Sequence, residues 1–305
     1  MTRAAPCTSL CAVLLVLGAL FARTAVAEHF AFGWPLPATA TVKSTVEKDG
    51  LVSTARYRVT LAAVPAAEDG ELELAFDEFA LLTMNGEDAT RPEVVARLGP
   101  LAALTSALPS MRLSATGDYR GVRGLNLVLQ RVLELLPEQT PADQRAQLER
   151  VLRSPRMQQL LQQKSGEIWN VWVAAWNGLD LSPGQQLEAH VPVAALGGKL
   201  DQEVLVEHLG AAPGAPDHVR LRMTTLIDGP ELATLLAGFA ESLAASGKLQ
   251  GNITAARSRS VTEVVTRAAD LVPRHAVSTT EVTVTDAAGR GYHQRERKEY
   301  WFEWP

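Results

Sequence analysis

Three tryptophans form the most distinctive group of side chains in this sequence. Trp169, Trp172 and Trp176 stand at i, i+3 and i+7, so they share one face of a predicted helix. Such a face could line an apolar pocket for an acyl chain or receive an apolar segment of a partner. The same spacing is typical of a helix sealed onto a sheet, because aromatic rings dominate protein cores. Both interpretations make this helix an anchor of the fold.

Basic side chains gather near the C-terminal end of an otherwise acidic chain. They are Arg257, Arg259, Arg274, Arg290, Arg295, Arg297 and Lys298. If the strands that carry them pair, Arg274, Arg295 and Arg297 could contact an anionic head group or an acidic partner. Interleaved glutamates such as Glu299 favour the alternative, which is cross-strand ion pairing on a solvated face.

The sequence contains none of the compact motifs that signal catalysis. It has no G-x-S-x-G nucleophile elbow, no P-loop and no H-E-x-x-H zinc motif. Glu188 and His190 could share a face of a strand, but such pairs are common by chance. We therefore expect no catalytic residue, no metal and no cofactor. A hydrolase whose serine or aspartate meets one of the six histidines only in the folded chain stays open.

The N-terminal third alternates apolar and polar residues with the period of β-strands. This pattern runs from Ala38 to Met84, with a hairpin turn at Asp49-Gly50 and a change of phase, typical of a bulge, at Asp77-Glu78. It predicts a three-stranded antiparallel meander. A capping box at Thr90 to Glu93 then opens a helical stripe that reaches Leu108, and a strand is expected from Met111 to Tyr119.

The remaining sequence predicts helices first and long strands afterwards. Helices are expected over 125–136, 141–153 and 155–176, strands over 186–193, 203–209 and 218–226, a capped helix from Asp228, and strands over 257–268, 274–285 and 291–304. Segregated antiparallel strands and helices indicate an α+β protein. We predict a long, strongly curved, half-barrel-like sheet packed on several amphipathic helices.

We expect one α+β domain over residues 28–305. Its two strand-rich parts, 38–124 and 185–305, are joined by a helical section at 125–177, and each is interrupted by one amphipathic helix. This arrangement suggests an old duplication, although no residue-level repeat is visible.

The first 27 residues have the pattern of a cleaved signal peptide. Arg3 precedes an apolar run from Leu10 to Phe21, and Ala25-Val26-Ala27 is an A-x-A cleavage pattern. We expect an exported protein, periplasmic or secreted, with no transmembrane segment in the mature chain. Cleavage removes both cysteines, and the loss of Arg3 and Arg23 moves the net charge from −5 to −7. An acidic excess argues against binding to nucleic acid or to anionic membranes in general.

An exported chain of long antiparallel strands with inserted helices resembles the LolA-type periplasmic lipoprotein carriers and related lipid-binding lipoproteins. The resemblance lies in the layout of residues 38–305 and in the closing meander from Leu271 to Phe302. It implies an incomplete barrel whose helices cover an apolar cavity. We therefore expect a non-enzymatic protein that binds an apolar or amphipathic ligand, such as a lipid or a lipidated molecule, through Trp169, Trp172 and Trp176. The alternative is an envelope scaffold that docks a protein.

Overall fold

The computed structural model describes residues 27–65, 70–94, 109–134, 136, 140–195, 198–244 and 253–305. The expected signal peptide therefore lies outside the described residues, except for Ala27, and so does the helical stripe beyond Val94. Within the described ranges, no helix is long and apolar enough to cross a membrane.

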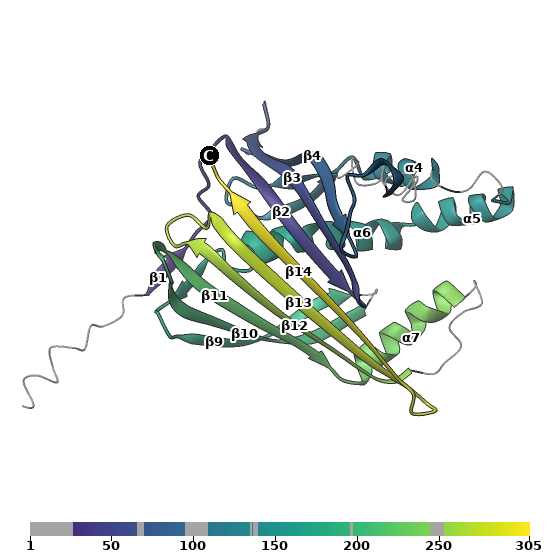
Figure 1. The fold of residues 1–305 in the computed structure, drawn as a ribbon. Coiled ribbons are helices and arrows are strands. Elements are labelled where there is room, and N and C mark those ends of the chain that lie inside the picture. Colours follow the sequence, from purple (N-terminus) through teal and green to yellow (C-terminus); the bar gives the residue numbers. More distant parts are fainter. Residues whose placement is uncertain are drawn as a thin grey trace, which may run out of the picture.

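Long antiparallel strands dominate the described chain (Figure 1). They are β1 (Glu28–Phe30), β2 (Ala38–Lys48), β3 (Leu51–Ala63), β4 (Leu72–Met84), β5 (Glu87–Asp88), β6 (Ser110–Leu113), β7 (Tyr119–Arg123), β8 (Leu179–Leu181), β9 (Gln186–Ala195), β10 (Gly198–Ala212), β11 (Ala215–Asp228), β12 (Ile253–Arg267), β13 (Pro273–Asp286) and β14 (Gly291–Glu303).

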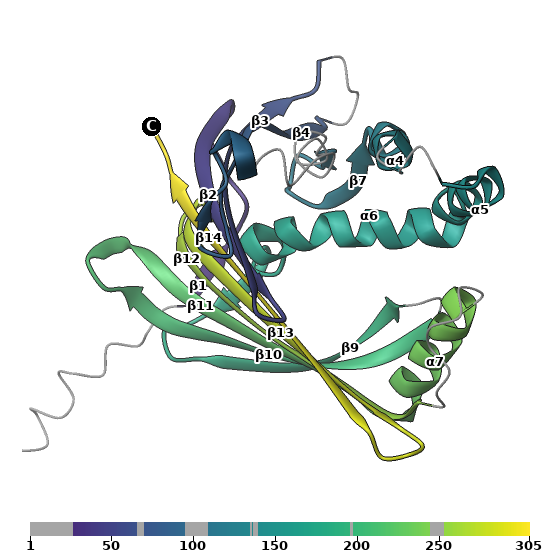
Figure 2. The same cartoon turned by 45° about the vertical axis from the view of Figure 1, so that its right-hand side comes forward.

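Strands β2 to β7 and β9 to β14 form one 12-stranded sheet in the described part of the chain. Its order is β7-β6-β4-β3-β2-β14-β13-β12-β11-β10-β9, with β5 beside β4. The two strand-rich parts join where β14 pairs with β2, in a register that runs from Glu296↔Lys48 to Glu303↔Thr41. The outermost strands, β7 and β9, do not pair with each other, so the sheet is curved but unclosed (Figure 2). This confirms the predicted fold class.

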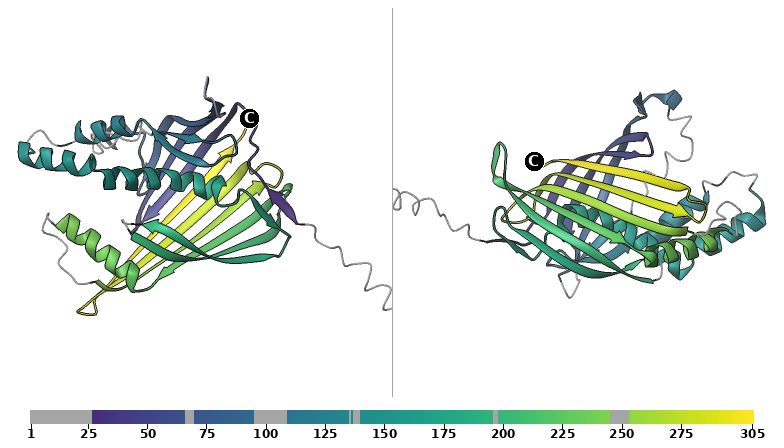
Figure 3. Two further views of the ribbon diagram at one scale, coloured as in Figure 1. Left: turned by 180° about the vertical axis from the view of Figure 1, so that it is seen from behind. Right: turned by 90° about the horizontal axis from the view of Figure 1, so that it is seen from below.

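The helices lie on the concave side of this sheet (Figures 2 and 3). They are α4 (Leu125–Glu134), α5 (Ala142–Leu152), α6 (Pro155–Trp169), a π-helical segment η1 (Asn170–Ala174) and α7 (Pro230–Ala244). Helix α6 packs on β7, η1 packs on β12 and β13, and α7 packs on β12 and β10. The section from α4 to η1 thus carries the chain across the concave face, from the β7 edge to the β9 edge.

Several local predictions are confirmed. Asp49 and Gly50 form the β2–β3 turn with φ values of 51° and 81°. The register of β3 on β4 shifts beside Asp77 and Glu78, as the change of phase predicts, and Glu78 has a φ of 50°. The terminal strands end within one or two residues of their predicted ends, except β12, which begins earlier, at Ile253.

Two predictions are wrong and one element was missed. The single strand expected from Met111 to Tyr119 is the hairpin β6–β7, because Asp118 accepts hydrogen bonds from the Ser114 and Thr116 hydroxyls and closes a turn. The helix expected to reach Trp176 is α-helical only to Trp169 and continues as η1. Strands β1 and β8 pair in a small separate sheet, and three-residue strands are too short to show a period.

An ion-pair cluster attaches β6 and β7 to the rest of the sheet. Glu71 accepts hydrogen bonds from Arg112 Nε at 2.8 Å and Nη2 at 2.5 Å, and from Arg123 Nη2 at 2.9 Å. The hydrogen bonds from Arg112, with the one from Arg123, lower the pKa of Glu71 from 4.5 to about 2. A carboxyl group whose pKa falls on folding stabilises the folded state above its ordinary pKa and loses this effect in acid.

We therefore predict that Glu71→Gln lowers the urea midpoint of unfolding at pH 7. The difference from the wild type should shrink as the pH falls from 4.5 towards 2, because the wild-type carboxylate is then protonated as well. Urea unfolding curves across this range test the prediction, with the exposed Glu303→Gln as the control. A difference that stays constant with pH would contradict it.

Gly117 occupies a place that no other residue fits without strain. Its φ is +85°, and an added Cβ would lie 2.5 Å from Phe32 Cγ. Phe32 is itself held, since its backbone N–H donates to Asn177 Oδ1 at 2.8 Å. Gly86 provides a matched control because its φ is +82° and nothing lies within 4 Å of an added Cβ.

We predict that Gly86→Ala costs about 1–2 kcal/mol of unfolding free energy through its backbone conformation alone. Gly117→Ala should cost about 1–3 kcal/mol more, because the methyl group overpacks the core at Phe32. Denaturant unfolding of both variants measures this difference, and equal losses would show that Phe32 moves aside freely.

Candidate functional site

A cavity of about 570 Å³ lies between the α6–η1 segment and the inner face of strands β9 to β14. Ile168, Val171 and Ala175 line it from the helical side. Val204 and Met223 provide apolar surface from the sheet. The rest of the sheet side is rich in hydroxyl groups, namely Thr225, Ser258, Ser260, Thr262, Ser278 and Thr280.

The alternation along β12 explains why the cavity forms at this place. Successive residues of a strand face opposite sides, so every second residue of β12 points to the concave face. These inward residues are Ala256, Ser258, Ser260, Thr262 and Val264. Val264 belongs to the large core beneath η1, and Ala256 belongs to a second core beneath α7. The hydroxyl-bearing stretch lies between the two apolar cores, and the cavity lies over it.

The hydroxyl groups bond to one another across β12 and β13. Ser260 Oγ and Thr280 Oγ1 lie 3.1 Å apart, and Thr262 Oγ1 donates to Ser278 Oγ at 3.2 Å. Each pair consists of residues directly opposite in the register. A bonded pair of hydroxyls still has one unused proton and several unused lone pairs. The sheet side of the cavity therefore keeps hydrogen-bonding capacity.

Charged side chains line the cavity in alternating sign. Lys298 Nζ lies 3.1 Å from Glu296 Oε2 and 3.8 Å from Glu167 Oε2. Lys164 Nζ lies 2.5 Å from Glu167 Oε1. The formal charges of these four groups cancel. Tyr300 also lines the cavity, and burial raises the pKa of its phenol, with Glu296 and Glu167 adding to the effect, so the phenol stays neutral.

The structure places Trp169, Trp172 and Trp176 in the large core, with each side chain fully buried. Trp172 packs edge-on against Phe302, with ring centroids 4.9 Å apart, and against Tyr300, at 5.5 Å. None of the three indoles is among the described residues that line the cavity. The structure brings them together as packing residues beside the site, and their contact with a ligand stays a prediction.

The basic side chains divide between two faces of the sheet. Arg295 and Arg297 lie on the convex face, where Arg295 Nε is 3.7 Å from Glu281 Oε1 and Arg297 Nη1 is 2.6 Å from Glu299 Oε2. Arg274 is exposed near the start of β13. Thr279, the residue of β13 that pairs with Arg297, lies five residues further along the strand, which corresponds to about 16 Å. Lys298 faces the cavity instead.

The three arginines therefore do not converge on one point. Their role as a head-group or partner contact stays a prediction.

The residues that do line the cavity were not predicted, although the sequence carries one signal for them. Ser258, Ser260 and Thr262 alternate along a predicted strand, which places three hydroxyls on one face.

A buried histidine in β10 forms a further polar site in the described part of the chain. His208 is buried; its Nδ1 accepts the Gly210 N–H at 2.9 Å, which leaves Nε2 as the donor to Glu28 Oε2 at 3.3 Å. Across the described ranges, no group of three or more His, Cys, Asp or Glu residues could hold a metal ion.

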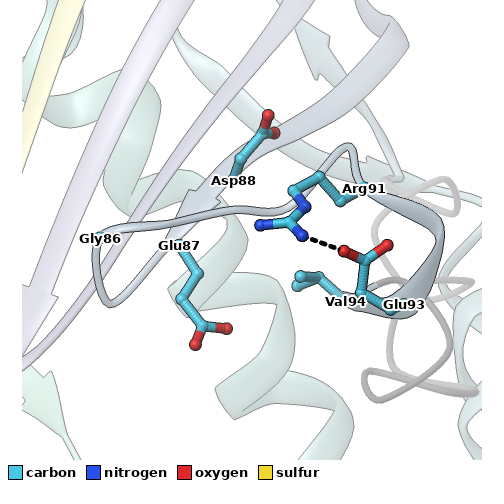
Figure 4. A pocket seen from close by; sticks show the side chains of 6 residues that line it. All are labelled: Gly86, Glu87, Asp88, Arg91, Glu93 and Val94. Carbon is cyan, nitrogen blue, oxygen red and sulfur yellow. Dashed lines mark ion pairs between the residues drawn. The ribbon is translucent and has the colours of Figure 1, made fainter.

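A second pocket, of about 680 Å³, lies beside β5 (Figure 4). Its lining includes Asp88, Arg91 and Glu93, and Arg91 pairs with Glu93. Hydrogen bonds from Thr90 lower the pKa of Asp88. One short stretch of chain, residues 86–94, lines this pocket, whereas the helical side and several strands together line the concave cavity.

Comparison with known proteins yields only remote structural likenesses. No family model and no curated protein sequence matches this chain. A solved structure described as "Lipid-protein interactions in lipovitellin" aligns with a TM-score of 0.43 and 10% sequence identity. The alignment covers 89% of this chain but 25% of the lipovitellin chain. This similarity is too low to assign a family or a function, so the resemblance to LolA-type carriers stays at the level of layout.

The buried indoles allow a matched test of their packing role. Trp169 Nε1 donates to Gly117 O at 2.8 Å, whereas Trp172 Nε1 has no hydrogen-bond partner among the described residues. We predict that Trp169→Phe destabilises the protein more than Trp172→Phe does, by about 1–3 kcal/mol, because only the first change leaves a buried carbonyl unsatisfied. Denaturant unfolding measures both values. An equal or larger loss for Trp172→Phe would contradict the prediction.

Proposed function

We propose that this protein is an exported binding protein that holds a lipid or a lipid-modified molecule in the concavity of its sheet. The observation that carries the proposal is the two-sided cavity: Ile168, Val171 and Ala175 face a sheet surface that combines apolar side chains with hydroxyls. Its volume, about 570 Å³, lies in the range of small-molecule sites. An apolar side and a polar side in one cavity suit an amphipathic ligand.

The β9 edge offers an entrance to this cavity. Val191 lines the cavity and is 40% exposed. Leu187 lies four residues before it on the same face of β9 and is 43% exposed. Exposed apolar side chains beside a cavity are typical of sites that receive an apolar ligand or partner. This supports entry of an acyl chain between β9 and the helical side.

The expected cleavage site lies directly before the first described strand. Cleavage after Ala27 leaves β1 whole, because that strand begins at Glu28. Glu28 contacts the buried His208, and His29 Nδ1 lies 2.8 Å from Asp180 Oδ1. The proposed mature chain would therefore keep all contacts of β1 on β8.

We predict that Met223→Trp weakens binding of an uncharged dansyl-labelled fatty alcohol by about tenfold or more, because the larger side chain occupies the cavity. Thr224→Trp is the matched control, since the next residue of β11 faces the convex side. Fluorescence titration of both variants, with circular dichroism to confirm folding, measures the effect. Equal weakening in both variants, or no binding by the wild type, would refute the proposal.

The alternative is an envelope scaffold that docks another protein, and one observation favours it. Trp301 is 49% exposed on the convex face, where it stacks on His275 with ring centroids 3.8 Å apart. Native mass spectrometry of protein purified from its own cells separates the two functions. A lipid-sized adduct that organic extraction removes supports the binding protein, whereas a stoichiometric protein partner without a small molecule supports the scaffold.

A further inference from the structure

We propose that the cavity selects lipids whose head group is uncharged and rich in hydroxyls, such as a glycosyl diacylglycerol. This inference rests on the proposed function and names the class of ligand. The polar group of such a ligand would lie on the hydroxyl-bearing floor, defined as Thr225, Ser258, Ser260, Thr262, Ser278 and Thr280. Its acyl chains would lie against the apolar side.

The first argument is the chemistry of the floor. The hydroxyls of the floor and the hydroxyls of a sugar both donate and accept hydrogen bonds. The floor can therefore act as donor or as acceptor towards a sugar head group. The cross-strand pairs Ser260–Thr280 and Thr262–Ser278 fix the positions of four of these groups and leave part of their capacity unused. A purely aliphatic ligand would leave this capacity unsatisfied when it displaced water, which is costly.

The second argument is the charge balance of the cavity. Lys298 is already within 4 Å of both Glu296 and Glu167, and Lys164 pairs with Glu167. A phosphate near Lys298 would also approach these carboxylates, so an anionic head group meets repulsion together with attraction. An uncharged head group leaves the ion pairs intact.

Competition binding with short-chain lipids tests this selectivity. An uncharged dansyl-labelled fatty alcohol is bound first and then displaced by galactosyl diacylglycerol or by phosphatidic acid with identical acyl chains. We expect the galactolipid to displace the probe at a concentration about tenfold lower, as a few net hydrogen bonds would provide.

A pair of variants assigns the preference to the floor. Ser260→Ala with Thr280→Val should abolish the preference, and the affinity of the probe is measured on the same variant so that displacement is compared at equal probe occupancy. The matched control is Thr45→Val with Thr54→Val, which removes a hydroxyl pair, 3.3 Å apart, on the convex face and should keep the preference. If the floor variant fails to fold by circular dichroism, Thr262→Val with Ser278→Ala provides the same test on the neighbouring pair.

The outcomes separate this inference from the function on which it rests. Probe binding with equal displacement by both lipids, or with preference for phosphatidic acid, overturns the selectivity but leaves the binding function standing. The selectivity is also overturned if a folded variant that lacks the Ser260–Thr280 pair or the Thr262–Ser278 pair still prefers the galactolipid. Absence of probe and lipid binding by the wild-type protein refutes the binding function itself.

Discussion

The pairing of β14 with β2 is the constraint on which the rest of the structure depends. It joins strands from opposite ends of the chain, from Glu296↔Lys48 to Glu303↔Thr41, and turns two strand groups into one sheet. Because both groups meet at the centre, their other ends, β7 and β9, become the edges. The chain between these edges must return across the concave face, and α4, α5, α6 and η1 are that return.

The positions of these helical segments decide which part of the concave face is packed against apolar side chains. Where η1 contacts β12 and β13, Trp172 packs against Tyr300 and Phe302, and the aromatic core is closed. At the other end α7 covers Leu200 and Ala256. Between the two apolar cores lies a stretch of the sheet that α6 and η1 face across the cavity. The sequence carries hydroxyls at that stretch instead of large apolar side chains, and the cavity is the result.

The hydroxyl-bearing floor also limits the free-energy cost of the cavity in the folded protein. An apolar cavity loses packing contacts along its whole surface, and the surrounding side chains tend to collapse into it. Hydroxyls such as Ser260 and Thr280 satisfy one another across the strands and can bond to water or to a ligand in exchange. The folded protein therefore tolerates the space without a ligand, and this would allow a ligand to enter and leave.

Local sequence determined the elements of this protein, whereas tertiary structure decided the site. Alternation, the Asp49-Gly50 turn and the bulge at Glu78 depend on near neighbours, so the strands, the hairpins and the α+β class were predictable. The hairpin β6–β7 was not, because Gly117 and Asp118 act through a side-chain turn that periodicity ignores. The i, i+3, i+7 spacing placed the three tryptophans on one face but could not separate core from pocket, since burial depends on what lies opposite. Arg297 and Lys298 are adjacent in sequence yet face opposite sides of the sheet, and only the register of β14 between β2 and β13 sets what each one meets.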